Sequence, residues 1–206
     1  MPTLLLSGQA TRHGTRSLLA CLPDETIVTA PHAGAGLLAI GPRLLHIARG
    51  QGLWAAAISY DAGLDLLGIP SRHAHPHPAL VAAYHRTYAA YDHRTRRWTV
   101  HGPAGTARTA LAAAIAEADA APSPILAPPA ARMATSAVDR AGHMARAQAV
   151  REEIARGEAF EINLAHVIRT PWEAGGWDLF ERLVATAPGD HSAYIDLGGI
   201  EIASIS

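Results

Sequence analysis

The chain has 206 residues, of which 49% are hydrophobic, and its 17 basic and 18 acidic residues give a formal net charge of −1. This length can bury one sizeable core or two small ones, and the charge balance gives no electrostatic basis for nucleic-acid binding. No apolar run reaches the roughly 18–20 residues of a membrane-spanning helix, and the start lacks the basic segment of a signal peptide. We therefore expect a cytoplasmic protein with neither nucleic acid nor membrane as a partner.

The basic residues are all of one kind. All 17 are arginine, and the sequence contains no lysine. A reaction that needs a lysine amine therefore cannot be served by these residues. Cys21 is the single cysteine, so an intrachain disulfide is excluded, which suits a reducing compartment.

The first half of the chain predicts several short strands. Brief apolar runs separated by glycine and proline favour strands over helices, and they occupy residues 4–6, 27–30, 37–40, 44–48 and 53–60. Residues 84–91 and 98–101 flank a polar stretch, which predicts a β-hairpin. A helix over residues 79–91 is the alternative, because alanine favours helices.

The second half predicts two long helices. Residues 106–120 are rich in alanine, and Thr106 is a candidate N-cap. Residues 139–156 predict the other helix, which ends at Gly157 in the C′ position. The apolar positions of this second helix form one stripe, Met144, Ala147, Val150 and Ile154.

The remaining elements predict an antiparallel arrangement. Residues 160–168 alternate apolar and polar side chains as a strand does, and residues 177–185 predict a short helix. Strands at 194–197 and 200–206 are joined by Gly198-Gly199, a hairpin signal. The order lacks regular β-α-β alternation, which indicates an α+β fold with an antiparallel β-sheet core, half of a two-sheet sandwich, flanked by helices.

Prolines divide the chain into regions. Residues 122–134 contain four prolines and predict a linker. Residues 1–121 before it form the predicted N-terminal antiparallel-sheet region, and residues 135–206 begin a second region. Because the chain finishes inside an apolar strand at 202–206, we expect that it is not a complete functional unit.

One histidine run could suggest a metal site. His73, His75 and His77 alternate, so an extended strand would place them on one face. Pro76 and Pro78 disfavour a regular strand, and the run is interpreted as a solvated loop.

Four segments resemble, in order, the N-terminal half of one enzyme family. Residues 4–8, Leu-Leu-Leu-Ser-Gly, are similar to a segment that lines this family's buried tryptophan pocket. Residues 53–63 resemble its GYLSYELG-like strand and turn, and residues 90–93 its DH hairpin. Residues 154–164 resemble its hallmark I..GDiyQvNL, and residues 187–206 resemble P..fsayl…ilSaSPE, up to the point where Pro-Glu would follow.

The family that these segments resemble comprises aminodeoxychorismate synthase component I and the anthranilate synthase large subunits. The resemblance covers essentially the whole chain, with local departures. Phe160 and Glu161 stand where the family usually has tyrosine and glutamine. A hydroxyl is lost at the first position, and an amide donor becomes a carboxylate acceptor at the second.

The resemblance implies a parent enzyme that aminates chorismate to 4-amino-4-deoxychorismate for p-aminobenzoate and folate biosynthesis. It implies Mg²⁺ and a glutamine amidotransferase subunit that supplies ammonia. The alternatives are an anthranilate synthase component I of tryptophan biosynthesis and a non-catalytic tryptophan-binding or regulatory domain. The family's metal-binding glutamates and lysine nucleophile lie in its C-terminal half, so we expect no catalytic or metal-binding residue here and an inactive chain. Residues 135–206 would then be the start of the chorismate-binding region.

The resemblance also nominates individual residues. Ser7, Pro188 and Tyr194 are candidates for a substrate or effector pocket, with tryptophan as the possible effector. Gly157 and Asn163 belong to the structural motif, and Asn163 is interpreted as a buried, hydrogen-bonded side chain.

Overall fold

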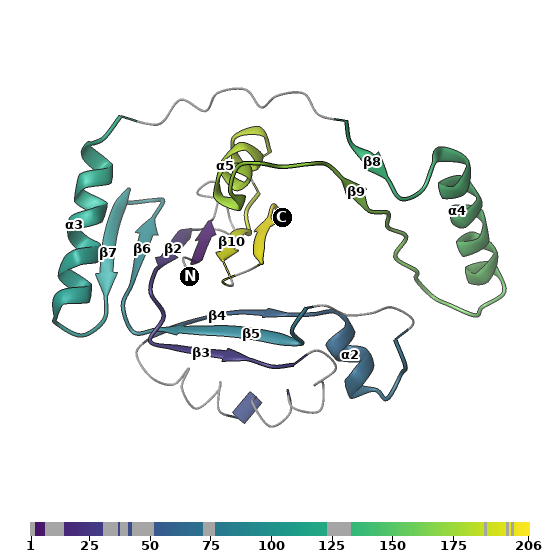
Figure 1. Ribbon diagram of the computed structural model, residues 1–206, viewed down its shortest axis with the longest axis horizontal. Helices are drawn as coiled ribbons and strands as arrows, with labels where there is room; N and C mark the ends of the chain where they lie inside the picture. The colour runs from purple at the N-terminus through teal and green to yellow at the C-terminus, as the bar shows by residue number, and fades with distance from the viewer. Residues whose placement is uncertain are drawn as a thin grey trace. The chain divides into compact units, whose positions relative to one another are not determined.

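The computed structural model describes residues 3–6, 15–30, 37, 41–42, 52–71, 77–122, 133–187, 189–196, 198 and 200–206 (Figure 1). Contacts divide the chain into two compact units. Unit 1 consists of Met1–Pro124 and Gly176–Ser206, and unit 2 consists of Ile125–Gly175. The sequence prediction kept residues 135–206 together, whereas contacts assign the last part of that stretch to unit 1.

The larger sheet of unit 1 has six strands in the order β11-β10-β1-β2-β6-β7, and all neighbours are antiparallel. The strands are β1 (Thr3–Leu6), β2 (Arg16–Ala20), β6 (Tyr88–Asp92), β7 (Arg97–His101), β10 (Ser192–Asp196) and β11 (Glu201–Ser204). The sheet thus joins the two ends of the described chain, because β1 pairs with β10. This arrangement and the helices beside it confirm the α+β class with antiparallel sheets.

The smaller sheet of unit 1 has the order β3-β5-β4, with β3 (Glu25–Val28), β4 (Leu53–Ile58) and β5 (Leu80–His85). The paired strands β2 and β6 of the larger sheet lead directly into the paired strands β3 and β5 of the smaller one. Leu22 adopts a left-handed φ of 54° in the connection from β2 to β3. Asp24 accepts the Arg86 backbone N–H at 2.8 Å and the Arg86 Nε–H at 2.7 Å. These contacts fix the corner where the two strands pass from one sheet to the other.

The core of unit 1 is built largely from small side chains. Along the central strand β5, Leu80, Val81, Ala82 and Ala83 are all buried. Buried polar residues accompany them, and His85 is fully buried. Because alanine contributes little apolar area, the few large buried side chains, such as Phe180, carry a disproportionate share of the burial.

Unit 1 includes the helices α2 (Asp61–Leu66), α3 (Thr106–Ala120) and α5 (Gly176–Thr186). Helix α3 contacts β6 and β7, and α5 contacts β10 and β11. The predicted bounds of α3 are confirmed, but its N-cap is Gly105 and Thr106 is already helical. No helix among the described residues is long and apolar enough to cross a membrane.

The predicted hairpins of unit 1 are confirmed with adjusted bounds. Strands β6 and β7 pair across the turn that follows Asp92, and residues 79–91 form strands rather than the alternative helix. In the β10–β11 hairpin, β10 ends at Asp196 and β11 begins at Glu201, and these two residues pair. Leu37 is helical where a strand was predicted, and residues 44–48 lie outside the described part.

Unit 2 contains α4 (Arg140–Ala155) and a short pair of strands, β8 (Thr135–Ser136) and β9 (Ile168–Arg169). Asp139 caps α4, because its side chain accepts the Gly142 N–H at 2.7 Å. At the other end, Gly157 has a φ of 77°, and the N–H groups of Gly157 and Glu158 bond back to Ile154 and Glu153. The predicted C′ glycine is therefore confirmed as part of a Schellman motif.

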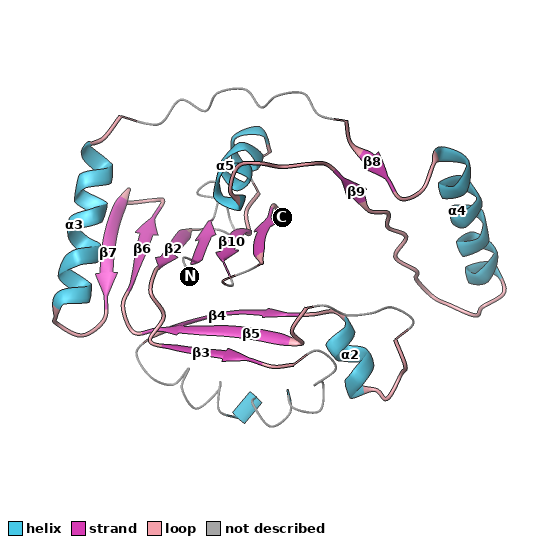
Figure 2. Cartoon of the chain, viewed as in Figure 1, coloured by secondary structure: helices cyan, strands magenta, loops and turns pink. Residues whose placement is uncertain are grey.

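The strand predicted at 160–168 is wrong over most of its length. Only Ile168 and Arg169 form a strand, and Figure 2 draws the preceding segment as loop. A strand is defined by hydrogen bonds to a neighbour, and no described strand lies beside residues 160–167. For the same reason Asn163 is exposed, and the interpretation of this residue as buried is wrong here.

Candidate functional site

Tyr194, a candidate from the sequence, lies buried between β10 and α5. Its ring packs edge-on against Trp177, with centroids 5.2 Å apart, and in a tilted arrangement against Phe180, with centroids 5.8 Å apart. Its hydroxyl donates a hydrogen bond to Glu201 Oε1, while Glu201 Oε2 accepts the Gly176 N–H at 3.1 Å. Burial first, and then the hydrogen bond and charge of Glu201, raise the pKa of Tyr194. Tyr194 and Glu201 therefore hold the start of α5 on the sheet.

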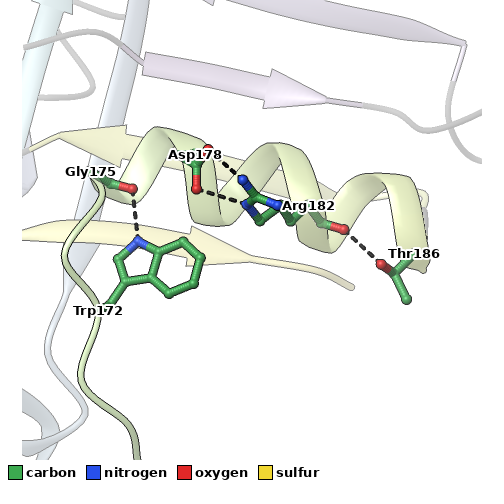
Figure 3. Close-up of polar contacts among 5 residues, drawn as sticks. All are labelled: Trp172, Gly175, Asp178, Arg182 and Thr186. Atoms are coloured by element: carbon green, nitrogen blue, oxygen red, sulfur yellow. Dashed lines mark hydrogen bonds and ion pairs between the residues drawn. The ribbon is translucent and has the colours of Figure 1, made fainter. Parts of the chain in front are cut away.

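The polar side of α5 is organised by local contacts (Figure 3). Arg182 donates from Nε at 2.8 Å and from Nη2 at 3.1 Å to the Asp178 carboxylate one turn earlier. This bidentate bond lowers the pKa of Asp178. Thr186 donates to the Arg182 carbonyl at 2.8 Å, and just before the helix the Trp172 indole donates to the Gly175 carbonyl at 3.1 Å. These contacts stabilise the helix and its entry rather than form a reactive site.

An apolar pocket of about 230 Å³ is the first candidate site of unit 1. Its lining comes from the end of β4, from the start of β5 and from β11. The apolar and polar lining residues are Ala57, Ile58, Ser59, His77, Pro78, Val81, Ile200 and Ile202. Such a lining suits an apolar ring with few polar groups.

Register separates this pocket from Tyr194. Ile202 pairs with Ile195, and Tyr194 pairs with Ala203. Because successive residues of a strand point to opposite faces, Ile202 and Tyr194 lie on opposite faces of the six-stranded sheet. Tyr194 therefore faces α5 and does not line the apolar pocket. Ser7 and Pro188 lie outside the described residues. The binding role of Ser7, Pro188 and Tyr194 therefore stays a prediction.

A second, polar pocket of about 480 Å³ lies on β2, β6 and β7. Its lining combines two arginines, one aspartate, two threonines, an alanine and a histidine: Arg16, Arg97, Asp92, Thr95, Thr99, Ala90 and His101. Asp92 pairs with Arg16 on one side and with Arg97 on the other, so the three side chains share one face of the sheet. This face thus presents a row of alternating charge.

The Asp92 carboxylate is engaged by the hairpin turn. Its Oδ1 accepts the backbone N–H groups of Arg94 and Thr95, each at 2.9 Å. The Thr95 N–H first, and then the Arg94 N–H and the Arg16 charge, lower the pKa of Asp92. The aspartate is therefore ionised at neutral pH and serves the turn.

The polar pocket was missed by sequence reasoning, although a signal for it existed. Arg97, Thr99 and His101 alternate along one strand of the predicted hairpin. Pairing that strand with the preceding one would have placed Asp92 opposite Arg97. The role of Arg16 depends on a strand far away in the sequence, which local patterns do not reveal.

The described residues offer no evident metal site. No group of three or more His, Cys, Asp or Glu side chains in the described part of the chain is arranged to hold a metal ion. The Mg²⁺ that the sequence resemblance implies is therefore not assigned to these residues.

Comparisons with known proteins place the fold. The profile described as chorismate binding enzyme matches residues 20–206, so the chain belongs to this family. The aminodeoxychorismate synthase of Streptomyces griseus is 27% identical over 166 residues, covering 74% of this chain and 22% of that protein. Anthranilate synthase component I from Streptococcus pneumoniae TIGR4 superposes with a TM-score of 0.67 at 16% identity, over 95% of this chain and 51% of that chain.

The lengths of these relatives bear on function. The chain spans 22% of the curated relative and 51% of the structural one. The activity, substrates and partners of such longer proteins do not follow directly for this chain.

Proposed function

We propose that the chain forms the N-terminal part of an aminodeoxychorismate synthase component I, which replaces the 4-hydroxyl of chorismate by an amino group. The match of residues 20–206 to the chorismate binding enzymes carries this proposal. The branch is favoured by the 27% identity to an aminodeoxychorismate synthase, since the likeness to anthranilate synthase, at 16% identity, concerns the fold alone. The product would supply p-aminobenzoate and folate synthesis.

The proposed role of this part is structural and regulatory rather than catalytic. The chain has no lysine to act as a nucleophile. In the family that it resembles, the metal-binding glutamates and the lysine lie in the C-terminal half, and a glutamine amidotransferase supplies the ammonia. We therefore expect a cytoplasmic chain that, by itself, does not catalyse the amination of chorismate.

The uncovered side chains of unit 2 support this role. Phe160, Met144 and Ile154 are 97%, 58% and 41% exposed. Exposed apolar side chains on a unit in which no described residue is buried favour a covering partner. A C-terminal half of the family's kind would supply that cover and the catalytic groups together.

The apolar pocket is the proposed effector site, with tryptophan as its ligand. Val81, Ile200 and Ile202 offer apolar contacts to an indole ring, while Ser59 and His77 add polar groups. Calorimetric titration with L-tryptophan is expected to show one saturable site. Ile202→Gln should weaken binding, whereas Ile195→Gln, a neighbour outside the pocket lining, should leave it unchanged. Absence of binding would contradict the effector role without affecting the chorismate assignment.

Deletion of the encoding gene tests the branch. The proposal predicts that the host then requires p-aminobenzoate and recovers when it is supplied. A requirement for tryptophan would instead favour anthranilate synthesis and contradict the proposed branch.

Assay of the chain alone tests its catalytic role. With chorismate, Mg²⁺ and ammonia, it is expected to form neither aminodeoxychorismate nor anthranilate. Formation of either product would overturn the assignment of catalysis to a C-terminal half.

A further inference from the structure

The polar pocket on β2, β6 and β7 has no part in the proposed function. From its geometry we propose that it binds a small oxyanion, a phosphate or a dicarboxylate. The inference rests on the lining side chains and does not depend on the chorismate assignment.

Two guanidinium groups of the pocket are available to a ligand. Arg16 and Arg97 flank Asp92 on neighbouring strands, and both are exposed. Within the described part of the chain, neither guanidinium has a hydrogen-bonded or ion-paired partner. Asp92 instead accepts two backbone N–H groups of the turn. The arginines therefore keep donors that a carboxylate or phosphate can accept in bidentate geometry.

The hollow itself results from a small residue among long ones. Ala90 is 8% exposed and lies in the row next to Arg16, Asp92 and Arg97, where it pairs with Thr99. Its methyl group forms the floor, while the longer lining side chains rise around it. The resulting volume of about 480 Å³ suits a small molecule rather than a protein segment.

The far end of the pocket adds further donors. The His101 ring stacks on Tyr88 with centroids 4.8 Å apart and an interplanar angle of 15°. This stacking fixes the imidazole at the edge of the pocket, and the Thr99 hydroxyl lies on the same strand face. Hydroxyl and imidazole N–H groups complement oxyanion acceptors.

Charge selects the ligand class. The two arginines and Asp92 give the lining a net charge of +1. A cation would be repelled, and a neutral ligand would leave the guanidinium donors unused. The carboxylate of Asp92 opposes any anion, so an oxyanion with two charges, which gains from both arginines, fits best.

Titration of the full chain with inorganic phosphate and, separately, malonate tests the inference. Both titrations are run at constant ionic strength set with sodium chloride. One saturable site is expected. Arg16→Gln and Arg97→Gln should each weaken binding by about fivefold or more, since each removes a charged donor. The matched control Arg94→Gln, which makes the same charge change in the adjoining turn outside the pocket lining, should alter affinity by less than about twofold.

Asp92→Asn gives an opposite prediction. It keeps the Oδ1 acceptor for the turn but removes the negative charge, so binding should tighten. Thermal unfolding of each variant shows whether the fold persists. The ligand that the unsubstituted chain binds more tightly, phosphate or malonate, would identify the natural ligand class. Either outcome of this comparison supports the site. Non-saturable binding, equal weakening by Arg94→Gln and Arg97→Gln, or weaker binding by folded Asp92→Asn would overturn it.

Discussion

Units 1 and 2 differ in what covers their apolar side chains. The two phenylalanines of the chain show this directly, because Phe180 in unit 1 is 2% exposed and Phe160 in unit 2 is 97% exposed. Every buried residue of the described chain lies in unit 1. Local signals are nevertheless strong in unit 2, where α4 has a side-chain cap at Asp139 and a Schellman motif at Gly157. Local capping interactions are therefore enough to define a helix, whereas a stable unit also requires buried apolar side chains.

Truncation of each phenylalanine tests this difference with the largest expected effect. Phe180→Ala should lower the free energy of unfolding of unit 1 by about 3–5 kcal/mol, because it removes a large buried ring. Phe160→Ala should change it by less than about 0.5 kcal/mol. Denaturant unfolding measures both. A large loss from Phe160→Ala would mean that unit 2 has cover in solution and would break the comparison.

Removal of a buried hydroxyl should have a smaller effect. Tyr194→Phe deletes the donor to Glu201 and leaves Glu201 Oε1 without this partner, so unfolding should become easier by about 1–2 kcal/mol. Tyr60→Phe is the matched control, since Tyr60 is 89% exposed. Equal stabilities of the two variants would show that the contact to Glu201 does not hold α5 in place.

The cap of α4 tests unit 2 by itself. Asp139→Ala should destabilise the helix by about 1 kcal/mol, because the Gly142 N–H loses its acceptor. The expected result is reduced helicity of α4 by NMR chemical shifts, with the unfolding midpoint of unit 1 unchanged. A shift of that midpoint would show that the two units unfold together.

The burial of His85 should make the stability of unit 1 depend on pH. Its ring is fully buried, and burial lowers its pKa below the ordinary 6.5, outweighing the opposing effects of the Cys21 backbone and the Asp24 charge. The unfolded chain then binds the proton more readily than the folded chain. The contribution of His85 to stability is therefore present above pH 6.5 and is lost as the pH falls below this value. His85→Leu should remove this dependence at a change of about 1 kcal/mol or less at neutral pH. An unchanged pH profile in His85→Leu would disprove the assignment to His85.

The sequence predicted best those elements whose cause is local. Asp139 and Gly157 mark the ends of α4 through bonds within a few residues, and the turn after Asp92 fixes the β6–β7 hairpin. The short helix α2 was missed, since Asp61-Ala62-Gly63 reads as a break in the preceding strand. The packing of α2 against other elements cannot be predicted from these few residues.

The sequence failed where a partner decides the outcome. Residues 160–167 have strand-like alternation, yet no neighbouring strand pairs with them in the described structure. The direction of Tyr194 toward α5 depends on the pairing of β10 with β1 and β11. The polar pocket likewise joins Arg16 to a hairpin more than 70 residues away. Long-range register, rather than local propensity, sets all three.

Hydrogen exchange of the intact chain tests the central contrast most directly. The amides of β5 (Leu80–His85) should exchange only through global unfolding of unit 1, since this central strand pairs on both sides. The amides of α4 (Arg140–Ala155) should exchange at rates near those of an unstructured peptide, because an uncovered 16-residue helix is marginal in water. Equal protection of α4 and β5 would contradict the account that unit 2 lacks its cover.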